Sequence, residues 1–283
     1  MGKVGLVCDS TCDLGPEWLA QHDVVMVPLK VLFGDTTYLD WIDLTPEAFY
    51  EKLATSPILP KTSQPSPAEF AAVYAALAEQ GCEEIVSIHL TAALSGTFES
   101  AMLAASGSKI PVRVVDTHTV SAGLAMTIQA ALDARAAGED AAGIEAAARY
   151  SVDNTQLLFA LDTLDYLVKG GRAGKAQGLA ASLLNIKPVL TFNNEGTIEP
   201  FKKVKGTKKA LTEIAARVAE ASNGRKVRVS LLHSLAPELA NDLLAEIAAT
   251  GVDYELVHTT IVGAVIGTYA GPRAVGAVYC PVQ

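Results

Sequence analysis

The first half of the chain alternates short apolar strands with alanine-rich helical stretches, and no other feature restricts the fold as strongly. Val4–Val7, Ile85–Ile88 and Val112–Val115 have the length and composition of buried strands. Each is followed by a polar or glycine-containing loop and then by a helical stretch. That order predicts parallel strands with helices on both faces, as in a Rossmann-like sheet.

The second half has a different order of predicted elements. We expect a hairpin at Asn193–Gly196, because this polar, glycine-ending turn stands between two apolar runs. Antiparallel neighbours beside other strands imply a mixed sheet, with helices on one side. The predicted strands are Gln156–Ala160, Lys187–Phe192, Thr197–Phe201, Val227–Leu232 and Tyr254–His258, and the predicted helices lie near Gln177–Leu184, Lys208–Ala221 and Pro237–Thr250.

The length of the chain agrees with two domains, because 283 residues exceed the size at which a single core usually keeps growing. Helices over Val120–Ala137 and Ala141–Ser151 carry the chain to a boundary near Asn154. We therefore expect an α/β fold of two domains, with a Rossmann-like α/β domain over 1–154 and a mixed-sheet α/β domain over 155–283. A ligand is expected between them, since domain interfaces are common binding places.

The composition excludes some classes of partner. A net charge of −9 repels both a nucleic-acid backbone and an anionic membrane surface. The stretch Leu256–Ala270 carries no formal charge but is shorter than the roughly 20 residues that span a bilayer. Four scattered cysteines indicate reduced thiols rather than a disulfide framework. We expect a cytoplasmic protein with no nucleic-acid partner and no stable membrane insertion.

Two turns could offer hydrogen-bond donors to an anion. Ser95-Gly96-Thr97 follows a predicted strand and opens a helix, where free backbone N–H groups and the helix dipole favour a negative charge. Taken alone, Ser95 is better explained as a plain helix cap. Thr62-Ser63 supplies a second donor turn just before the helix that begins at Ser66-Pro67. Turns at the carboxyl ends of parallel strands converge in one crevice, which favours the anion site.

Ser95 is also a candidate nucleophile, and a serine esterase is the alternative function. The residues Ala93–Thr97 lack the first and last glycines of the strained nucleophile elbow. His89 ends a buried strand and is expected to point into a neighbouring element rather than at Ser95. No histidine pair has metal-ligand spacing on a helix, so no metal site is expected.

Cationic side chains occur at two notable places. Gly170–Lys175 resembles a phosphate loop but is one residue short of it, and the glycines also suit a helix C-cap. Arg172 on this exposed turn is a planar bidentate donor for a carboxylate or phosphate. The second place is a basic cluster in an acidic chain, which is either a solvated face or a docking patch for an acidic partner or phosphate. Its members are Lys202, Lys203, Lys205, Lys208 and Lys209.

A set of short motifs with characteristic order and spacing extends over almost the whole chain. They are Asp9–Leu14, Thr62–Pro67, Leu94–Ala101, Asp116–Gly123, Leu164–Arg172, Leu184–Leu190, Lys202–Gly206 and Gly271–Gly276. Together they resemble the DegV family of bacterial fatty-acid-binding proteins. The resemblance implies a two-domain α/β carrier that buries one long-chain fatty acid between its domains and is not itself an enzyme.

The resemblance also implies a partner. Family members present the fatty acid carboxylate to a separate fatty acid kinase, related to dihydroxyacetone kinases, which forms an acyl phosphate. The ATP chemistry belongs to that kinase, so the carrier needs no cofactor. By motif, Thr62 and Ser95 would hold the carboxylate, with Ser63 and Gly96 in the same turns. Arg172 would serve phosphate or kinase engagement.

At two further positions the chain carries a residue that differs from the one common in the family. Lys205 takes the place of a family basic residue that is often arginine. Gly267–Arg273 departs from the family pattern, because Tyr269 stands where a histidine is common. A tyrosine hydroxyl donates one hydrogen bond but does not become cationic near neutral pH as histidine does. We expect Tyr269 to be a neutral neighbour of the carboxylate.

Overall fold

The computed structural model describes residues 2–182 and 187–282. A parallel sheet forms the centre of the first half, with strand order β2-β1-β6-β7. Its strands are β1 (Lys3–Asp9), β2 (Val24–Val27), β6 (Cys82–His89) and β7 (Val112–Asp116). The predicted parallel sheet is confirmed, and β2 is an additional edge strand.

Helices cover both faces of this sheet because successive strand residues point to opposite faces. Val7 and Ile85 pack in one cluster with α3 (Pro67–Glu79) and α4 (Thr97–Ser106). Leu6 and Val86 pack on the other face with α5 (Ala122–Ala136) and α6 (Ala141–Asn154). Burial on both faces explains why the middle of these strands is largely apolar, as in Leu6–Cys8 of β1 and Ile85–Ile88 of β6.

The second half forms a six-stranded mixed sheet with strand order β10-β9-β8-β13-β11-β12. β11 and β12 pair in parallel, whereas the other described pairs are antiparallel. The strands are β8 (Gln156–Ala160), β9 (Lys187–Phe192), β10 (Ile198–Val204), β11 (Val227–His233), β12 (Tyr254–Ile261) and β13 (Val275–Pro281). The mixed sheet and the β9–β10 hairpin are confirmed, while β13 was not predicted.

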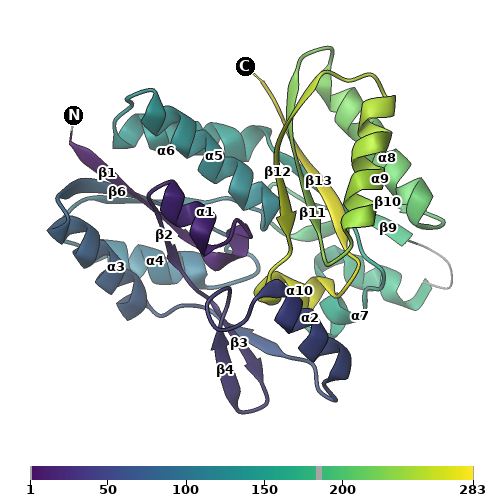
Figure 1. Ribbon diagram of the computed structural model, residues 1–283, viewed down its shortest axis with the longest axis horizontal. Helices are drawn as coiled ribbons and strands as arrows, with labels where there is room; N and C mark the ends of the chain where they lie inside the picture. The colour runs from purple at the N-terminus through teal and green to yellow at the C-terminus, as the bar shows by residue number, and fades with distance from the viewer. Residues whose placement is uncertain (1, 183–186, 283) are drawn as a thin grey trace.

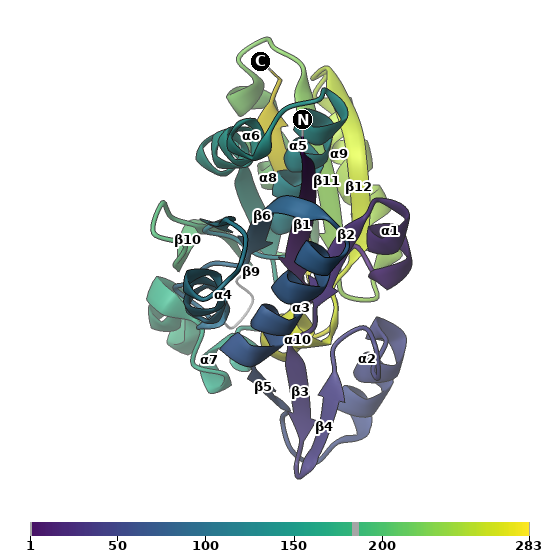
Figure 2. The same ribbon diagram turned by 90° about the vertical axis from the view of Figure 1, so that its left-hand side faces the viewer.

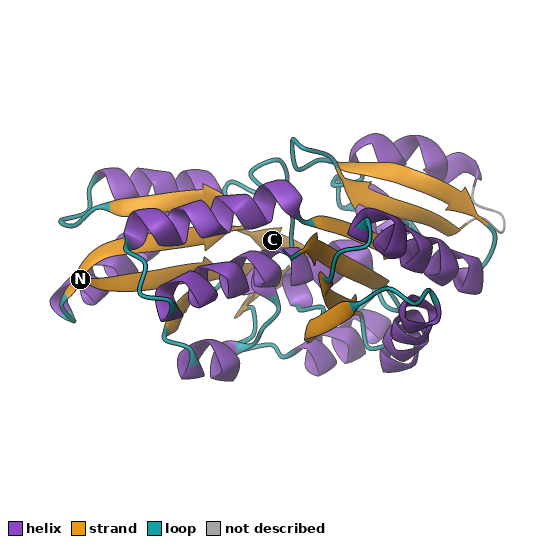
Figure 3. Ribbon diagram, turned by 90° about the horizontal axis from the view of Figure 1, so that it is seen from above, coloured by secondary structure: helices purple, strands orange, loops and turns teal. Residues whose placement is uncertain are grey.

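The two sheets share a layer of helices. α8 (Thr207–Ser222) and α9 (Pro237–Ala249) cover one face of the mixed sheet, where Leu158 packs with them. Leu157 and Phe159 point to the other face and belong to the cluster that contains α5. The expectation of helices on one side is therefore wrong for the folded molecule, because α5 and α6 lie between the sheets (Figures 1 and 3).

A small antiparallel sheet, absent from the predicted elements, lies at one end of the molecule. It has the order β4-β3-β5 and protrudes beside α2 in Figure 2. Its elements are β3 (Lys30–Phe33), β4 (Thr36–Leu39), α2 (Pro46–Thr55) and β5 (Lys61–Ser63). Phe33 and Phe49 from this unit pack against Val265 of α10 (Ala264–Ala270), so the small sheet is joined to the second half of the chain.

The remaining elements are short. They are a 3-10 helix over Ser10–Cys12, α1 (Pro16–Gln21), α7 (Asp165–Lys169) and a 3-10 helix over Gly174–Ser182. The helix predicted over Gln177–Leu184 lies partly outside the described residues, and its described part belongs to this second 3-10 helix. Among the described helices, none has the length and apolar character required to span a bilayer.

Candidate ligand-binding site

A cavity of about 250 Å³ lies where the parallel sheet, the mixed sheet and α10 meet. Leu90 and Leu94 reach it from the loop after β6, Phe159 and Phe192 from the mixed sheet, and Ile266 from α10. Packed protein interiors contain few voids larger than a water molecule. A cavity of this size with such a lining is therefore a preformed binding space for an apolar group.

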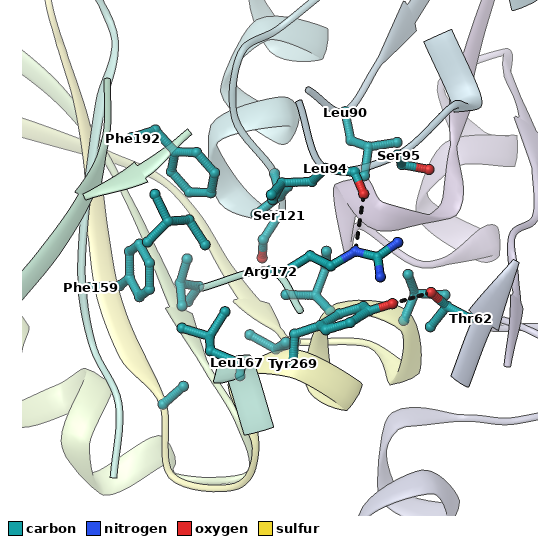
Figure 4. A pocket seen from close by; sticks show the side chains of 18 of the residues that line it. Thr62, Leu90, Leu94, Ser95, Ser121, Phe159, Leu167, Arg172, Phe192 and Tyr269 are labelled. Atoms are coloured by element: carbon teal, nitrogen blue, oxygen red, sulfur yellow. Dashed lines mark hydrogen bonds between the residues drawn. The ribbon is translucent and has the colours of Figure 1, made fainter. Parts of the chain in front are cut away.

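Hydroxyl groups gather at one end of the cavity. The Thr62 Oγ1 and Tyr269 Oη atoms lie 2.5 Å apart and share a hydrogen bond, although the residues are far apart in sequence (Figure 4). Thr62 belongs to β5, not to a turn at the edge of the parallel sheet as expected, and Tyr269 belongs to α10. Ser63 also lines the cavity. The structure thus brings together three of the residues that were predicted to bind the ligand.

The turn after β6 supplies Ser95 to the same end of the cavity. Ser95 is not a helix cap, because the N-cap of α4 is Gly96 and the Ser95 Oγ atom lies 2.9 Å from Thr97 Oγ1. Gln64 joins the two donor segments, since its Nε2 donates to the Gly96 carbonyl at 3.2 Å. Gly96 is therefore a support for the site, whereas Ser95 and Gln64 line the cavity itself.

Arg172 lies at the same end, and this corrects its predicted position on an exposed turn. Its half-buried side chain lines the cavity, with Nε donating to the Leu94 carbonyl at 3.3 Å. The guanidinium carbon lies 5.1 Å from the centre of the Tyr269 ring, within reach of a cation–π contact. A permanent positive charge thus lies beside the hydroxyl groups of the cavity.

The glycine turn before Arg172 explains how its backbone is held. Gly171 has φ of +72°, a conformation that glycine adopts readily. The Gly171 N–H donates to the Val168 carbonyl at 3.1 Å, and the Arg172 N–H donates to the Leu167 carbonyl at 3.0 Å. These paired bonds form a Schellman motif at the end of α7, so the predicted C-cap is confirmed. The cap fixes the point from which Arg172 enters the cavity wall.

Lys205 does not belong to this cavity. It lies exposed after β10, outside the cavity lining, together with the exposed Lys203 and Lys208. Lys202 in the same cluster is paired with Glu213 at 2.6 Å. The basic cluster is therefore a surface feature, separate from the site at Thr62 and Arg172.

A chain of buried hydrogen bonds supports the loop that carries Leu90 and Ser95. The Asp9 Oδ2 atom accepts from the Leu90 N–H at 3.0 Å and lies 3.1 Å from His89 Nδ1. His89 Nε2 in turn lies 2.7 Å from Ser87 Oγ. His89 and Asp9 are fully buried, so these bonds hold the end of β6 without competition from water.

Two buried carboxylates hold the beginning of α10. Asp13 Oδ1 accepts from the Gly263 N–H at 2.9 Å, and Asp40 Oδ1 accepts from the Ala264 N–H at 3.1 Å. Burial raises the pKa of Asp40 to about 7, against the opposing effect of its bonds to Ser10 and backbone N–H groups. Burial also raises the pKa of Asp13 well above its usual range. The hydrogen bonds that these two carboxyl groups accept from the backbone orient the helix that carries Tyr269.

Ser121 is a site residue that sequence reasoning missed. It lines the cavity, and its hydroxyl donates to Asp13 Oδ2 at 2.5 Å. Its φ of +53° is rare for a residue with a side chain and carries a conformational cost of the order of 1–3 kcal/mol. Its position within the motif Asp116–Gly123 was the available signal, but the local sequence alone did not indicate its unusual backbone.

The surroundings of Ser95 differ from those of a catalytic serine. His89 points to Asp9 and Ser87, as predicted, and not to Ser95. The five histidines of the chain all lie within the described residues, and each contacts another group: His22 with Trp18, His89 with Asp9, His118 with Asp116, His233 with the Ala236 N–H, and His258 with Trp18. Within residues 2–182 and 187–282, no group of three His, Cys, Asp or Glu side chains could hold a metal ion.

Fold and site together define a class of α/β proteins in which an apolar cavity between two sheets ends in a cluster of hydrogen-bond donors. The model of the family described as "Uncharacterised protein, DegV family" matches residues 3–282. A DegV domain-containing protein of Streptomyces coelicolor is 36% identical over 276 residues, which are 97% of each chain. The chain belongs to the DegV family.

Solved structures give the same result. A DegV family protein from Thermus thermophilus, described by its fatty acid binding, superposes with a TM-score of 0.93 at 34% identity, over 99% of this chain and 100% of that one. A stearic acid-binding protein from Eubacterium ventriosum superposes with a TM-score of 0.85 at 27% identity, over 99% and 98% of the two chains. The two-sheet architecture is thus the architecture of this family.

Proposed function

We propose that this chain is a cytoplasmic carrier that buries one long-chain fatty acid and presents its carboxylate to a partner fatty acid kinase. One observation carries the proposal: the apolar cavity ends in donors from Thr62, Ser95, Arg172 and Tyr269. A fatty acid has the matching shape, with one anionic end on an apolar chain. The relatives described as binding fatty acids support the same class of ligand.

The expected free energies of burial and hydrogen bonding are compatible with the binding of a fatty acid. Burying a dozen or so methylene groups at ~0.8 kcal/mol each gives on the order of 10 kcal/mol. Association and chain ordering offset several kcal/mol of that gain. A bare buried carboxylate would lose several kcal/mol more, whereas each hydrogen bond to the charged group returns ~1.5–3 kcal/mol. The apolar cavity thus supplies affinity, and the donors make burial of the head group tolerable.

The donor end also suits presentation to a kinase. Thr62, Ser95 and Tyr269 are neutral donors that leave a carboxylate oxygen nucleophilic. Arg172 adds a positive charge that can meet an incoming phosphate as well as the carboxylate. The exposed cluster at Lys205 is proposed as the docking surface for the acidic or phosphate-bearing face of the kinase complex. In this proposal the chain supplies no catalytic group.

The proposal is tested on protein purified from a bacterial host. Organic extraction followed by mass spectrometry is expected to yield near-stoichiometric fatty acid of roughly 14 to 18 carbons, the scale of a typical ligand cavity. Recovery of a nucleotide or sugar phosphate in its place would contradict the proposal. The alternative of a Ser95 esterase predicts covalent labelling of Ser95 by a fluorophosphonate, and a folded protein that resists labelling excludes it.

Tyr269→Phe removes only the hydroxyl that contacts Thr62. If that hydroxyl donates to an ionised carboxylate, fatty acid affinity should fall by about 1.5–3 kcal/mol. Titration of delipidated protein with a fluorescent fatty acid measures the change. Tyr254→Phe is the matched control, because Tyr254 begins β12 and does not line the cavity. Equal affinity of the two variants would make Tyr269 a packing residue only.

A further inference from the structure

The apolar cavity has a neighbour of opposite character. A polar cleft of about 510 Å³ lies beside it and is lined by groups such as Thr117, Asn154, Gln156 and Arg217. Within this cleft, Gln156 Oε1 accepts from the Tyr279 hydroxyl, and Arg217 Nε lies 3.4 Å from the same oxygen. Polar groups arranged in this way favour water and not hydrocarbon.

Two side chains line both spaces. They are Leu157 of β8 and Phe192 at the end of β9. Leu157 is 4% exposed and belongs to the core of the mixed sheet, whereas Phe192 is only partly buried. The Phe192 ring packs against Phe159, with ring centres 5.9 Å apart. A thin wall of these side chains therefore separates the apolar cavity from the polar cleft.

This wall stands away from the donor end. Figure 4 shows Phe159 and Phe192 on one side of the cavity and Thr62, Ser95 and Tyr269 on the other. A ligand whose carboxylate meets the hydroxyl groups must therefore direct its methyl end toward the aromatic pair. Phe192 ends β9 and directly precedes the β9–β10 turn, where the Gly196 carbonyl accepts from Thr91 Oγ1 at 3.2 Å. The ring is thus held between fixed elements.

We propose that Phe192 is the residue that sets the upper limit of acyl chain length, by closing the apolar cavity against the polar cleft. The inference rests on the proposed function and adds a specificity determinant to it. Up to the limit, each methylene that becomes buried raises affinity about fourfold. Beyond it, the chain meets the Phe192 ring, and affinity falls because a packed wall tolerates little added volume.

Removal of the ring tests this role. Phe192→Ala opens the cavity into the cleft, so a long chain can pass through without a clash. In titrations with saturated fatty acids from lauric to behenic acid, the wild type should reach a maximum and then lose affinity. Phe192→Ala should bind behenic acid roughly tenfold or more tightly than wild type, with a smaller change for myristic acid. Phe192→Trp should shift the limit toward shorter chains.

Phe201→Ala is the matched control, because Phe201 lies exposed on β10 outside both cavities. It should retain the wild-type chain-length profile. If the wild type binds fatty acids and both Phe192 variants keep its chain-length profile, Phe192 does not limit chain length, and the proposed function remains intact. A wild type that binds none of the series would overturn the proposed function itself. If Phe192→Ala fails to fold, the opposite shift in Phe192→Trp still decides the question.

Discussion

Asp40→Asn is expected to remove a pH-dependent part of the stability of this protein. The Asp40 carboxyl is fully buried and has a pKa of about 7 in the folded chain, compared with about 4 when unperturbed. The folded state therefore holds a proton that the unfolded chain has lost over this interval. The resulting stabilisation is fully present below about pH 4 and disappears as the pH rises through about 7.

The expected size follows from the width of this interval. A shift of about three pKa units corresponds to a change of the order of 4 kcal/mol between pH 4 and pH 7. Urea unfolding at several pH values measures it as the difference in unfolding free energy between wild type and Asp40→Asn. Asp13→Asn should show a difference of the same sign, because burial raises the pKa of Asp13 too. If the unfolding free energies of wild type and Asp40→Asn depend on pH in the same way, the prediction is contradicted.

Arg172→Ala is expected to weaken fatty acid binding as well as acyl-phosphate formation. From the sequence, Arg172 was expected on an exposed turn, where it would serve phosphate or kinase engagement and not hold the carboxylate. In the structure the side chain lines the cavity beside Tyr269, where its guanidinium can donate to the carboxylate. Loss of a hydrogen bond to a charged group should lower affinity roughly ten- to hundredfold. Arg172→Lys should recover only part of it, since an ammonium lacks the planar fork.

A paired assay of fatty acid affinity and kinase turnover on the same preparations measures both effects. Lys175→Ala is the control, because Lys175 is an exposed cation near Arg172 that pairs with Glu199 at 3.0 Å and does not line the cavity. It should bind fatty acid as wild type does. Normal affinity with lost turnover in Arg172→Ala would restore the division of labour that the sequence suggested.

The large sheets could be predicted because burial leaves a clear pattern. β1 and β6 are covered on both faces, so their apolar residues form nearly continuous runs instead of alternating with polar ones. The small sheet could not be predicted, since β4 reads Thr-Thr-Tyr-Leu, with its first two residues exposed. Its strands have three or four residues each and gain their order from packing against α10. That contact joins segments from opposite halves of the chain, which no local pattern records.

The binding site, like the fold, could be predicted from the sequence only in part. Thr62, Ser63, Ser95 and Tyr269 were named from motifs, and all line one cavity. The apolar lining was not foreseen, because a strand residue that faces a cavity has the same periodicity as one that faces the core. Leu157 and Leu158 are adjacent and both buried, yet only Leu157 reaches the cavity. The sequence predicted the polar chemistry of the site, whereas its shape depends on how the two halves pack.

The helical layer that both sheets share restricts how a ligand can be exchanged. Many binding proteins with two lobes admit ligand by swinging the lobes apart about a hinge. Here α5 packs against strands of both sheets. A hinge rotation would therefore separate the apolar residues of α5 from one of the two sheets and expose them to solvent. Exposure of that surface costs about 25 cal/mol per Å². We therefore expect exchange through movements of small peripheral elements, such as α10 or the β3–β5 sheet, while the two large sheets keep their mutual position.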